Sequence, residues 1–495
     1  TGEYKIYFRP LLSNYSNYLN RMRPYANNVA QAERDKLKYI NNWGRYPFQY
    51  TLNRAFYFCN NLDVIATDCP LLYGSTDNAT NSNISEFFRN TVNLFNENGS
   101  IGNWDISRVN TLVSTFMLAK NLSNKVALNK WYTSNVTSIS STFYGCPWSG
   151  SLASSLVTNN GRTYIAWDTS NITSMNETFL GLNGSDSRLW GGKVTGIGNW
   201  NTSKLISMYG AFRGQSATYT RTSSFNEDIN TKEVTIAAGT PYETTYNAWD
   251  VSKVTRFGQT ANGRWYQGPF FGSAFNQPLN KWQINTGSAV SIGSVPNFNQ
   301  PISQSTVTVG TGDNEKTYEA WNVKAVNNFS YAFHNIAYNS RTSSFNQDIS
   351  GWDMSGATNL SQMFWRNTTF SGSVSTWNIS NATTIGSMFR GANAWFNQQH
   401  NLSSSYQNHP TRGEYIAWDT SNVTSMFGVF QNEISAYASI GSVSSPGYNG
   451  DITNWNTSNV TDMRSMFNGT SVLTSSFNQD ISTKEVTIGA GTPIE

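Results

Sequence analysis

A tryptophan-centred unit that recurs eleven times constrains this 495-residue chain more than any other feature of its sequence. The clearest copies read WDISRVNTLVSTF from Trp104, WDTSNITSMNETF from Trp167 and WNTSNVTDMRSMF from Trp455. The remaining copies begin at Trp131, Trp200, Trp249, Trp282, Trp321, Trp352, Trp377 and Trp418. Self-similarity of this kind is typical of an array whose units pack only on their neighbours, and not of separate domains.

Nine copies carry a phenylalanine twelve positions after the tryptophan. These residues are Phe116, Phe143, Phe179, Phe212, Phe333, Phe364, Phe389, Phe430 and Phe467. We predict that the eleven tryptophans and nine phenylalanines form the structural core. The units at Trp249 and Trp282 lack this phenylalanine, so a kink or a special surface is expected in the middle of the array.

The spacing of apolar residues inside a unit predicts its local structure. Val109, Leu112 and Phe116 follow the i, i+3, i+7 pattern of a helical face, which predicts one or two helical turns after each tryptophan. Upstream, FNEDI at Phe225 and FNQDI at Phe345 indicate a short extended segment. The predicted fold is a leucine-rich-repeat-like α/β solenoid of short parallel strands and short helical turns, with a core unit of about 25 residues and hairpin insertions.

Four of the insertions share a pattern of their own. They end in Tyr-x-Ala-Trp, at Tyr164, Tyr246, Tyr318 and Tyr415. Alternating VTI and VTV segments precede two of these tyrosines, separated from them by Gly-rich polar residues, which indicates β-hairpins. We expect hairpins to project from one flank, either as recognition elements or as spacers that cover an edge.

The array predicts three regions along the chain. Residues 1–50 are expected to be an N-terminal cap or junction, with a strand in EYKIYFRP and a helix through Asn28–Tyr39. Residues 51–103 are read as degenerate first units, and residues 104–495 as the repeat array. The last segment, FNQDISTKEVTIGAGTPIE, nearly repeats the segment that begins at Phe225, so the natural chain is expected to continue beyond Glu495, or a partner to cover that end.

Composition argues against several classes of function. Charged residues make up only 13% of the chain, the net charge is +3, and no long basic run is present, so a nucleic-acid partner is not expected. No apolar run reaches the roughly 18 residues of a membrane span, so no membrane insertion is expected either. Cys59, Cys69 and Cys146 are too few for a disulfide framework; a Cys59–Cys69 bridge and buried thiols remain the two alternatives.

No catalytic, cofactor-binding or metal-binding residue stands out. His334, His400 and His409 have no metal-ligand spacing, and no enzyme activity is expected. The aspartates that follow tryptophan form a periodic set that suggests a calcium ladder, but asparagine replaces them in four units, which favours turn capping. The asparagines of the FNxxI segments (Asn226, Asn346 and Asn478) are expected to hydrogen-bond backbone between units, with ligand binding as the alternative.

The motifs WDTSNVTSMFGVF at Trp418 and FNQDISGWDMS at Phe345 resemble the BspA-like leucine-rich-repeat surface proteins, in particular the short W-D-x-S-x-V-x-x-M-x-x-M-F subtype. The resemblance covers the chain from about Arg54 to Glu495. It implies display on bacterial, mycoplasma or protist surfaces, and similar repeats occur in virion structural proteins of phages and large marine viruses. It implies attachment to host molecules, matrix or neighbouring cells, without catalysis.

The expected function is therefore that of an extracellular adhesion or receptor-binding repeat protein on a cell or virion surface, with a host-surface protein or glycan as partner. The alternative is a structural filament or shell component, in which neighbouring copies of the chain assemble through the ends of the array. A sugar-cleaving enzyme is a third hypothesis, which would require a pair of carboxylates in a cleft.

Overall fold

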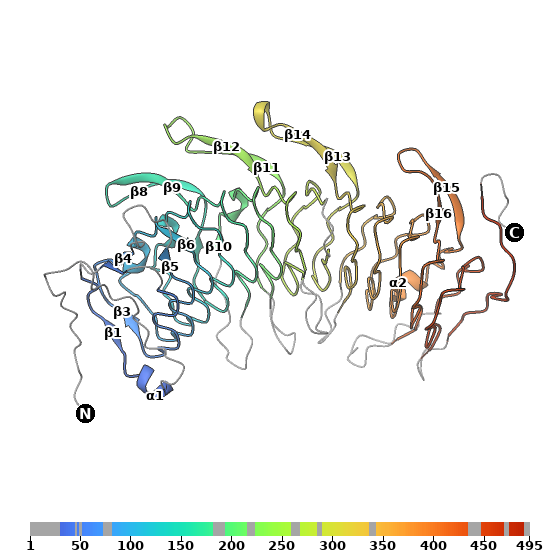
Figure 1. The fold of residues 1–495 in the computed structure, drawn as a ribbon, viewed down its shortest axis with the longest axis horizontal. Coiled ribbons are helices and arrows are strands. Elements are labelled where there is room, and N and C mark those ends of the chain that lie inside the picture. Colours follow the sequence, from blue (N-terminus) through green and yellow to red (C-terminus); the bar gives the residue numbers. More distant parts are fainter. Residues whose placement is uncertain are drawn as a thin grey trace.

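A computed structural model describes residues 30–44, 47–48, 52–72, 82–181, 194–214, 223–258, 268–284, 290–335, 343–433, 447–469 and 475–489. Successive tryptophan units lie side by side along the long axis of an elongated molecule, from the blue end of the chain to the red end (Figure 1). We call each unit a layer and name it by its tryptophan. The strand expected at EYKIYFRP lies outside the described residues.

Regular secondary structure is short throughout the described ranges. The helices are the α-helices α1 (Gln31–Arg34) and α2 (Asn393–Phe396) and the 3-10 helices η1 (Ser100–Asn103), η2 (Leu128–Lys130), η3 (Ile197–Asn199) and η4 (Gly312–Asn314). Parallel pairing joins β1 (Tyr39–Ile40) to β3 (Asp63–Val64), β2 (Pro47–Phe48) to β4 (Leu71–Leu72), β5 (Ser82–Asn83) to β6 (Val109–Thr111), and β7 (Gly150–Ser151) to β10 (Val194–Thr195). No helix within these ranges has the length and apolarity needed to cross a bilayer.

The four remaining pairs are antiparallel hairpins. They are β8 (Ser155–Asn159) with β9 (Arg162–Ala166), β11 (Lys232–Ile236) with β12 (Thr244–Ala248), β13 (Ser305–Val309) with β14 (Lys316–Ala320), and β15 (Ser405–His409) with β16 (Gly413–Ala417). Each hairpin ends immediately before a tryptophan, so hairpins are present at all four Tyr-x-Ala-Trp motifs.

The expected leucine-rich-repeat-like α/β solenoid is wrong, because the described residues form a β-rich fold of eight small two-stranded sheets with very little helix. Neither α-helix lies in the segment that directly follows a repeat tryptophan, where the helical turns were expected. Instead, isolated parallel bridges join the seventh residue after each tryptophan to its counterpart in the next layer. One run of bridges connects Thr111, Ser138, Ser174, Ser207 and Arg256, and another connects Asn328, Asn359, Thr384, Ser425 and Asp462.

The backbone explains why no helix forms there. The N–H groups of Leu112, Ser114 and Phe116 donate to carbonyls of the next layer at 2.9–3.0 Å, and so do not close helical bonds within their own unit. Ser114 also has a φ of 55°, in the left-handed region that interrupts a right-handed helix. The i, i+3, i+7 spacing therefore marks side chains that point inward from the short strand that begins at Val109 and from the turns after it, which hold Phe116.

Aromatic columns run through the interior along the stacking direction. Phe116 stacks on Phe143 with ring centroids 6.1 Å apart, and Phe143 stacks on Phe179 at 5.7 Å. The tryptophans of the Trp167 and Trp200 layers stack at 5.8 Å. Offset-stacked pairs of this kind contribute about 0.5–1.5 kcal/mol each beyond the area that they bury.

In the middle of the array, phenylalanines at other sequence positions continue the aromatic column. Phe270, which lies twenty-one positions after Trp249, stacks on Phe212 at 5.8 Å and fills the place of the missing phenylalanine. In the Trp282 layer, Phe298 stacks on Phe275 at 6.0 Å and on Phe345 at 6.3 Å. The phenylalanines of the FNxxI segments therefore continue the column through the Trp282 layer, which lacks the phenylalanine twelve positions after its tryptophan.

Candidate binding surface on the hairpin edge

The four hairpins project from one long edge of the molecule and lean towards its N-terminal end (Figure 1). Outward-facing threonine pairs join the strands of three of them. Their hydroxyl oxygens lie 3.0 Å apart in Thr158–Thr163, 2.9 Å in Thr235–Thr245 and 2.8 Å in Thr308–Thr317. The hairpins thus present polar, hydrogen-bonding faces to solvent along this edge.

A tyrosine fastens each hairpin to the preceding layer. The hydroxyl of Tyr246 donates to the carbonyl of Asn199 at 2.6 Å, and that of Tyr415 donates to the carbonyl of Thr376 at 2.8 Å. Tyr164 and Tyr318 make the same bond to Lys130 and Lys281. Every acceptor is the residue immediately before the tryptophan of the preceding layer, so the Tyr-x-Ala-Trp motif is a hairpin anchor.

Burial holds these anchors in the protonated form that can donate. It raises the pKa of Tyr246 and of Tyr318 to about 12. It also raises the pKa of Tyr164 and of Tyr415 above the usual value for a phenol. The anchors are therefore neutral hydrogen-bond donors at physiological pH.

The tryptophan after each hairpin has an unusual backbone. Trp167, Trp249, Trp321 and Trp418 have φ values of 47°, 51°, 49° and 51°, whereas the other repeat tryptophans are not in the left-handed region. Their backbone N–H groups donate to the carbonyl of the preceding layer's tryptophan at 3.0–3.1 Å. A bulky residue in this region stores on the order of 1–3 kcal/mol of strain. The hairpin thus re-enters the layer through a strained residue that the anchor and the interlayer bond hold in place.

Two hairpin tips are neutralised by aspartates that lie two layers back. Arg162 lies 3.5 Å from Asp105, and Lys316 lies 3.0 Å from Asp250. The loop between β13 and β14 also touches the hairpin before it: the hydroxyl of Thr311 donates to Glu233 at 2.8 Å. This loop therefore passes over the irregular Trp282 layer and ties β13–β14 to β11–β12 and to the Trp249 layer.

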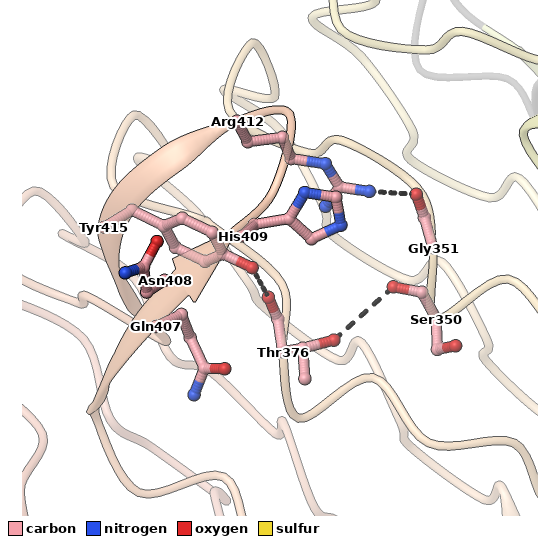
Figure 2. Close-up of a pocket in the computed structure, with 8 residues that line it drawn as sticks. All are labelled: Ser350, Gly351, Thr376, Gln407, Asn408, His409, Arg412 and Tyr415. Carbon is pink, nitrogen blue, oxygen red and sulfur yellow. Dashed lines mark hydrogen bonds between the residues drawn. The ribbon is translucent and has the colours of Figure 1, made fainter.

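A polar hollow of about 220 Å3 lies under β15–β16 (Figure 2). It is lined by Ser350, Gly351, Thr376, Gln407, Asn408, His409, Arg412 and Tyr415. The Arg412 guanidinium donates to the carbonyls of Gly351 and of Trp352, the latter at 3.3 Å. The hairpin and the layer edge thus enclose a space whose lining carries no carboxylate.

The residues that sequence reasoning assigned to the core lie inside the stack. Trp104, Trp131, Trp167, Trp200, Trp249, Trp282, Trp321, Trp352, Trp377 and Trp418 are at most 2% exposed, as are Phe116, Phe143, Phe179, Phe212, Phe333, Phe364, Phe389 and Phe430. Trp455 and Phe467 are partly buried and pack against the same cluster. None of these side chains lines the hollow.

Each of these tryptophans except Trp104 also makes a hydrogen bond that sequence reasoning missed. Its indole Nε1 donates to a backbone carbonyl of an earlier segment, such as Ile101 for Trp131, Leu128 for Trp167 and Ile197 for Trp249, at 2.7–3.1 Å. The signal in the sequence is that a tryptophan begins all eleven units from Trp104 to Trp455. The bond supplies a directional contact between layers that apolar packing alone does not give.

The recurrent polar residues cap turns and join layers. Asp105, Asp168, Asp250, Asp353 and Asp419 each accept the N–H of the serine two positions on, at 3.0–3.1 Å, so the turn-capping interpretation is confirmed. The expected backbone role is also confirmed for Asn226 and Asn346, which accept N–H groups of the next layer at 2.8 and 2.9 Å. Across the described ranges, no three His, Cys, Asp or Glu side chains gather as a metal site.

The histidines and cysteines occupy different environments. His334 is fully buried, and burial lowers its pKa to about 4, whereas His400 packs on Trp395 and His409 lines the hollow. All three cysteines are free, and burial raises the pKa of Cys59 and Cys146 to about 12. The disulfide alternative for Cys59 and Cys69 is therefore wrong.

One family of proteins matches nearly the whole array. The model of the family described as "Mycoplasma protein of unknown function, DUF285" matches residues 52–160, 153–304, 310–405 and 399–488. No curated protein and no solved structure shows significant similarity to the chain.

Proposed function

Because the chain belongs to the family described as Mycoplasma protein of unknown function, DUF285, and consists of its repeats, we propose that it is a non-catalytic attachment protein displayed on a cell or virion surface. The hairpin edge is its binding face, and a host-surface protein or glycan is its partner. The resemblance of its motifs to BspA-like surface proteins supports both the extracellular location and the attachment role.

The observation that carries this proposal is the anchored row of hairpins. Within the described residues, no hairpin leads directly into the other seven repeat tryptophans, so stacking alone does not require these insertions. Each hairpin nevertheless brings a half-buried tyrosine anchor and a tryptophan in a strained backbone conformation. The core does not need the hairpins, yet they are held in fixed positions along one edge. A binding surface requires side chains held in fixed positions in this way.

The test removes the hairpins and keeps the layers. Residues 155–166, 232–248, 305–320 and 405–417 are each replaced by Ser-Gly, the dipeptide that precedes Trp352. Binding of the intact and shortened chains to a glycan array and to intact animal cells is then compared. We expect the intact chain to bind and the shortened chain to lose at least about tenfold in affinity, equivalent to about 1.4 kcal/mol.

Circular dichroism and tryptophan fluorescence verify that the shortened chain keeps its layers. An intact chain that binds no cell and no glycan would overturn the attachment function. A folded, shortened chain that binds as well as the intact one would place the binding face away from the hairpin edge.

A further inference from the structure

The β15–β16 hairpin departs from the other three on the face turned towards the layers. In β8, β11 and β13, a valine pairs with the anchor tyrosine across the hairpin: Val157, Val234 and Val307. In β15, Gln407 occupies that position opposite Tyr415. Two residues further along, Ile236 in β11 and Val309 in β13 are buried, whereas β15 has the half-buried His409 and β8 the half-buried Asn159.

These exchanges have a physical consequence. In β11 and β13, valine and isoleucine at the two positions fill the space between hairpin and layer with apolar side chains, and the polar residues of β15 line a hollow instead. These two hairpins serve as an internal comparison, because the same anchor and the same strand register are kept. Polar residues at both positions, Gln407 and His409, therefore distinguish β15 from β11 and β13.

Arg412 differs from the cations of two other hairpins because, among the described residues, no carboxylate pairs with it. Arg162 and Lys316 of the other hairpins lie within ion-pair distance of aspartates two layers back. The corresponding aspartate here, Asp353, is only 7% exposed, and no ion pair joins it to Arg412. Among the described residues, no carboxylate lies within 4.0 Å of the Arg412 guanidinium, which two backbone carbonyls hold in place.

The hollow offers further hydrogen-bonding groups. Nδ1 of His409 accepts the backbone N–H of Thr411 at 3.3 Å, so in the neutral ring Nε2 carries the hydrogen and is a donor. Gln407 contributes an amide, and Ser350 and Thr376 contribute hydroxyls, whereas Asn408 lies on the outward face of β15. Tyr415 adds an aromatic ring (Figure 2).

We propose that this hollow binds an acidic saccharide, with Arg412 pairing the carboxylate and with Gln407 and His409 bonding the ring hydroxyls. A hydroxyl-rich ring both donates and accepts, which matches amides and hydroxyls in a shallow open site. Guanidinium groups bind carboxylates through two parallel N–H bonds, which gives preference over neutral sugars. The absence of carboxylates from the lining argues against a metal-ion ligand. The inference rests on the proposed attachment function and names its ligand class.

The test measures binding of 3′-sialyllactose and of lactose to the intact chain by ligand-observed NMR titration. We expect sialyllactose to bind saturably and lactose to bind at least about tenfold more weakly, equivalent to about 1.4 kcal/mol. Arg412→Gln should reduce sialyllactose binding by a similar factor. The double variant Gln407→Val with His409→Val, which restores the filling residues of β13, should abolish binding.

Arg162→Gln is the matched control, because it removes the tip cation of another hairpin and should leave binding unchanged. Absence of sialyllactose binding, equal binding of lactose, or full binding by Arg412→Gln would overturn the assignment. If the chain still attaches to cells in that case, the attachment function stands and only the hollow is wrongly assigned; loss of both would reject both.

Discussion

The indole Nε1 of Trp418 lies 2.8 Å from the backbone carbonyl oxygen of Val374 and donates a hydrogen bond to it. Trp418 belongs to one layer, and Val374 lies just before the tryptophan of the preceding layer. Nine other repeat tryptophans make the equivalent bond, of which those from Trp377 to Ile349 and from Trp455 to Leu402 are further examples. The repeat therefore requires tryptophan itself, since phenylalanine would fill much of the same space without the donor.

Trp418→Phe should lower the free energy of unfolding by more than the lost ring volume explains. The change leaves a buried carbonyl without its partner, which costs about 1–3 kcal/mol. Trp395→Phe is the matched control, because Trp395 is fully buried but its Nε1 has no partner. Urea unfolding of the two variants checks this, and equal losses would contradict a contribution from the indole bond.

Tyr246→Phe should loosen β11–β12 while leaving the layers intact. It removes the hydroxyl that donates to Asn199, at a cost of about 1 kcal/mol. Hydrogen exchange of the β11–β12 amides should accelerate severalfold relative to the Trp200 layer. Tyr242→Phe, at an exposed position in the loop of the same hairpin, should leave exchange unchanged. Unchanged exchange in Tyr246→Phe would mean that the anchor does not hold the hairpin.

His334 should make the protein acid-sensitive. Burial lowers its folded-state pKa to about 4 from the ordinary value of 6.5, so the unfolded state binds the proton more readily. Stability from this group is full above the unfolded pKa and is lost as pH falls from about 6.5 to about 4, by on the order of 3 kcal/mol. His334→Asn keeps a donor for Tyr331 and removes the titration. As pH falls from about 6.5 to about 4, the original protein should lose unfolding free energy relative to the His334→Asn variant. Parallel curves of unfolding free energy against pH for the two proteins would refute the prediction.

Glu433→Gln should destabilise the Trp352 and Trp377 layers. The Glu433 carboxylate accepts bonds from Arg366 and from Arg390, the latter at 2.6 Å. Burial alone would raise the pKa of Glu433, but these two guanidinium groups lower it below the usual value. The stability of this cluster is therefore present above about pH 4.5 and lost as pH falls through the lowered folded value.

The glutamine variant should cost about 2–3 kcal/mol at neutral pH, because it leaves two half-buried guanidinium groups facing a neutral amide. Thermal unfolding measures the change. Glu33→Gln breaks the exposed pair with Lys36 and should leave the unfolding temperature unchanged. Equal effects of the two substitutions would show that the Glu433 cluster acts as an ordinary surface pair.

The hairpins and the turn caps were predictable because their signals are local. Alternation around Val234 and Val307 indicates strands directly, and an aspartate two positions before a serine N–H can cap a turn in many folds. Helical turns were wrongly predicted because Val109, Leu112 and Phe116 span only eight positions. Over so short a stretch, a three-residue strand followed by turns, with Ser114 in the left-handed region, produces the same spacing as a helix.

The hollow could not be predicted from any single motif. Gln407 and His409 become informative only when the four Tyr-x-Ala-Trp insertions are compared in register, which requires the strand pairing. The filling of the column by Phe270 was hidden for a related reason, since it lies well beyond the twelve-residue spacing of the other units.

The tyrosine anchors also bear on how such a protein diversifies. Each hairpin is fastened at its base by the tyrosine hydroxyl and re-enters its layer through the same type of tryptophan, while the loop contacts differ from one hairpin to the next. Residues 237–243, the 3-10 turn η4 and the Pro410–Arg412 loop are three different connections between strands with the same anchor and the same register. Under the proposed attachment function, exchange of one such loop would change the partner bound at that hairpin while the tyrosine anchor is kept.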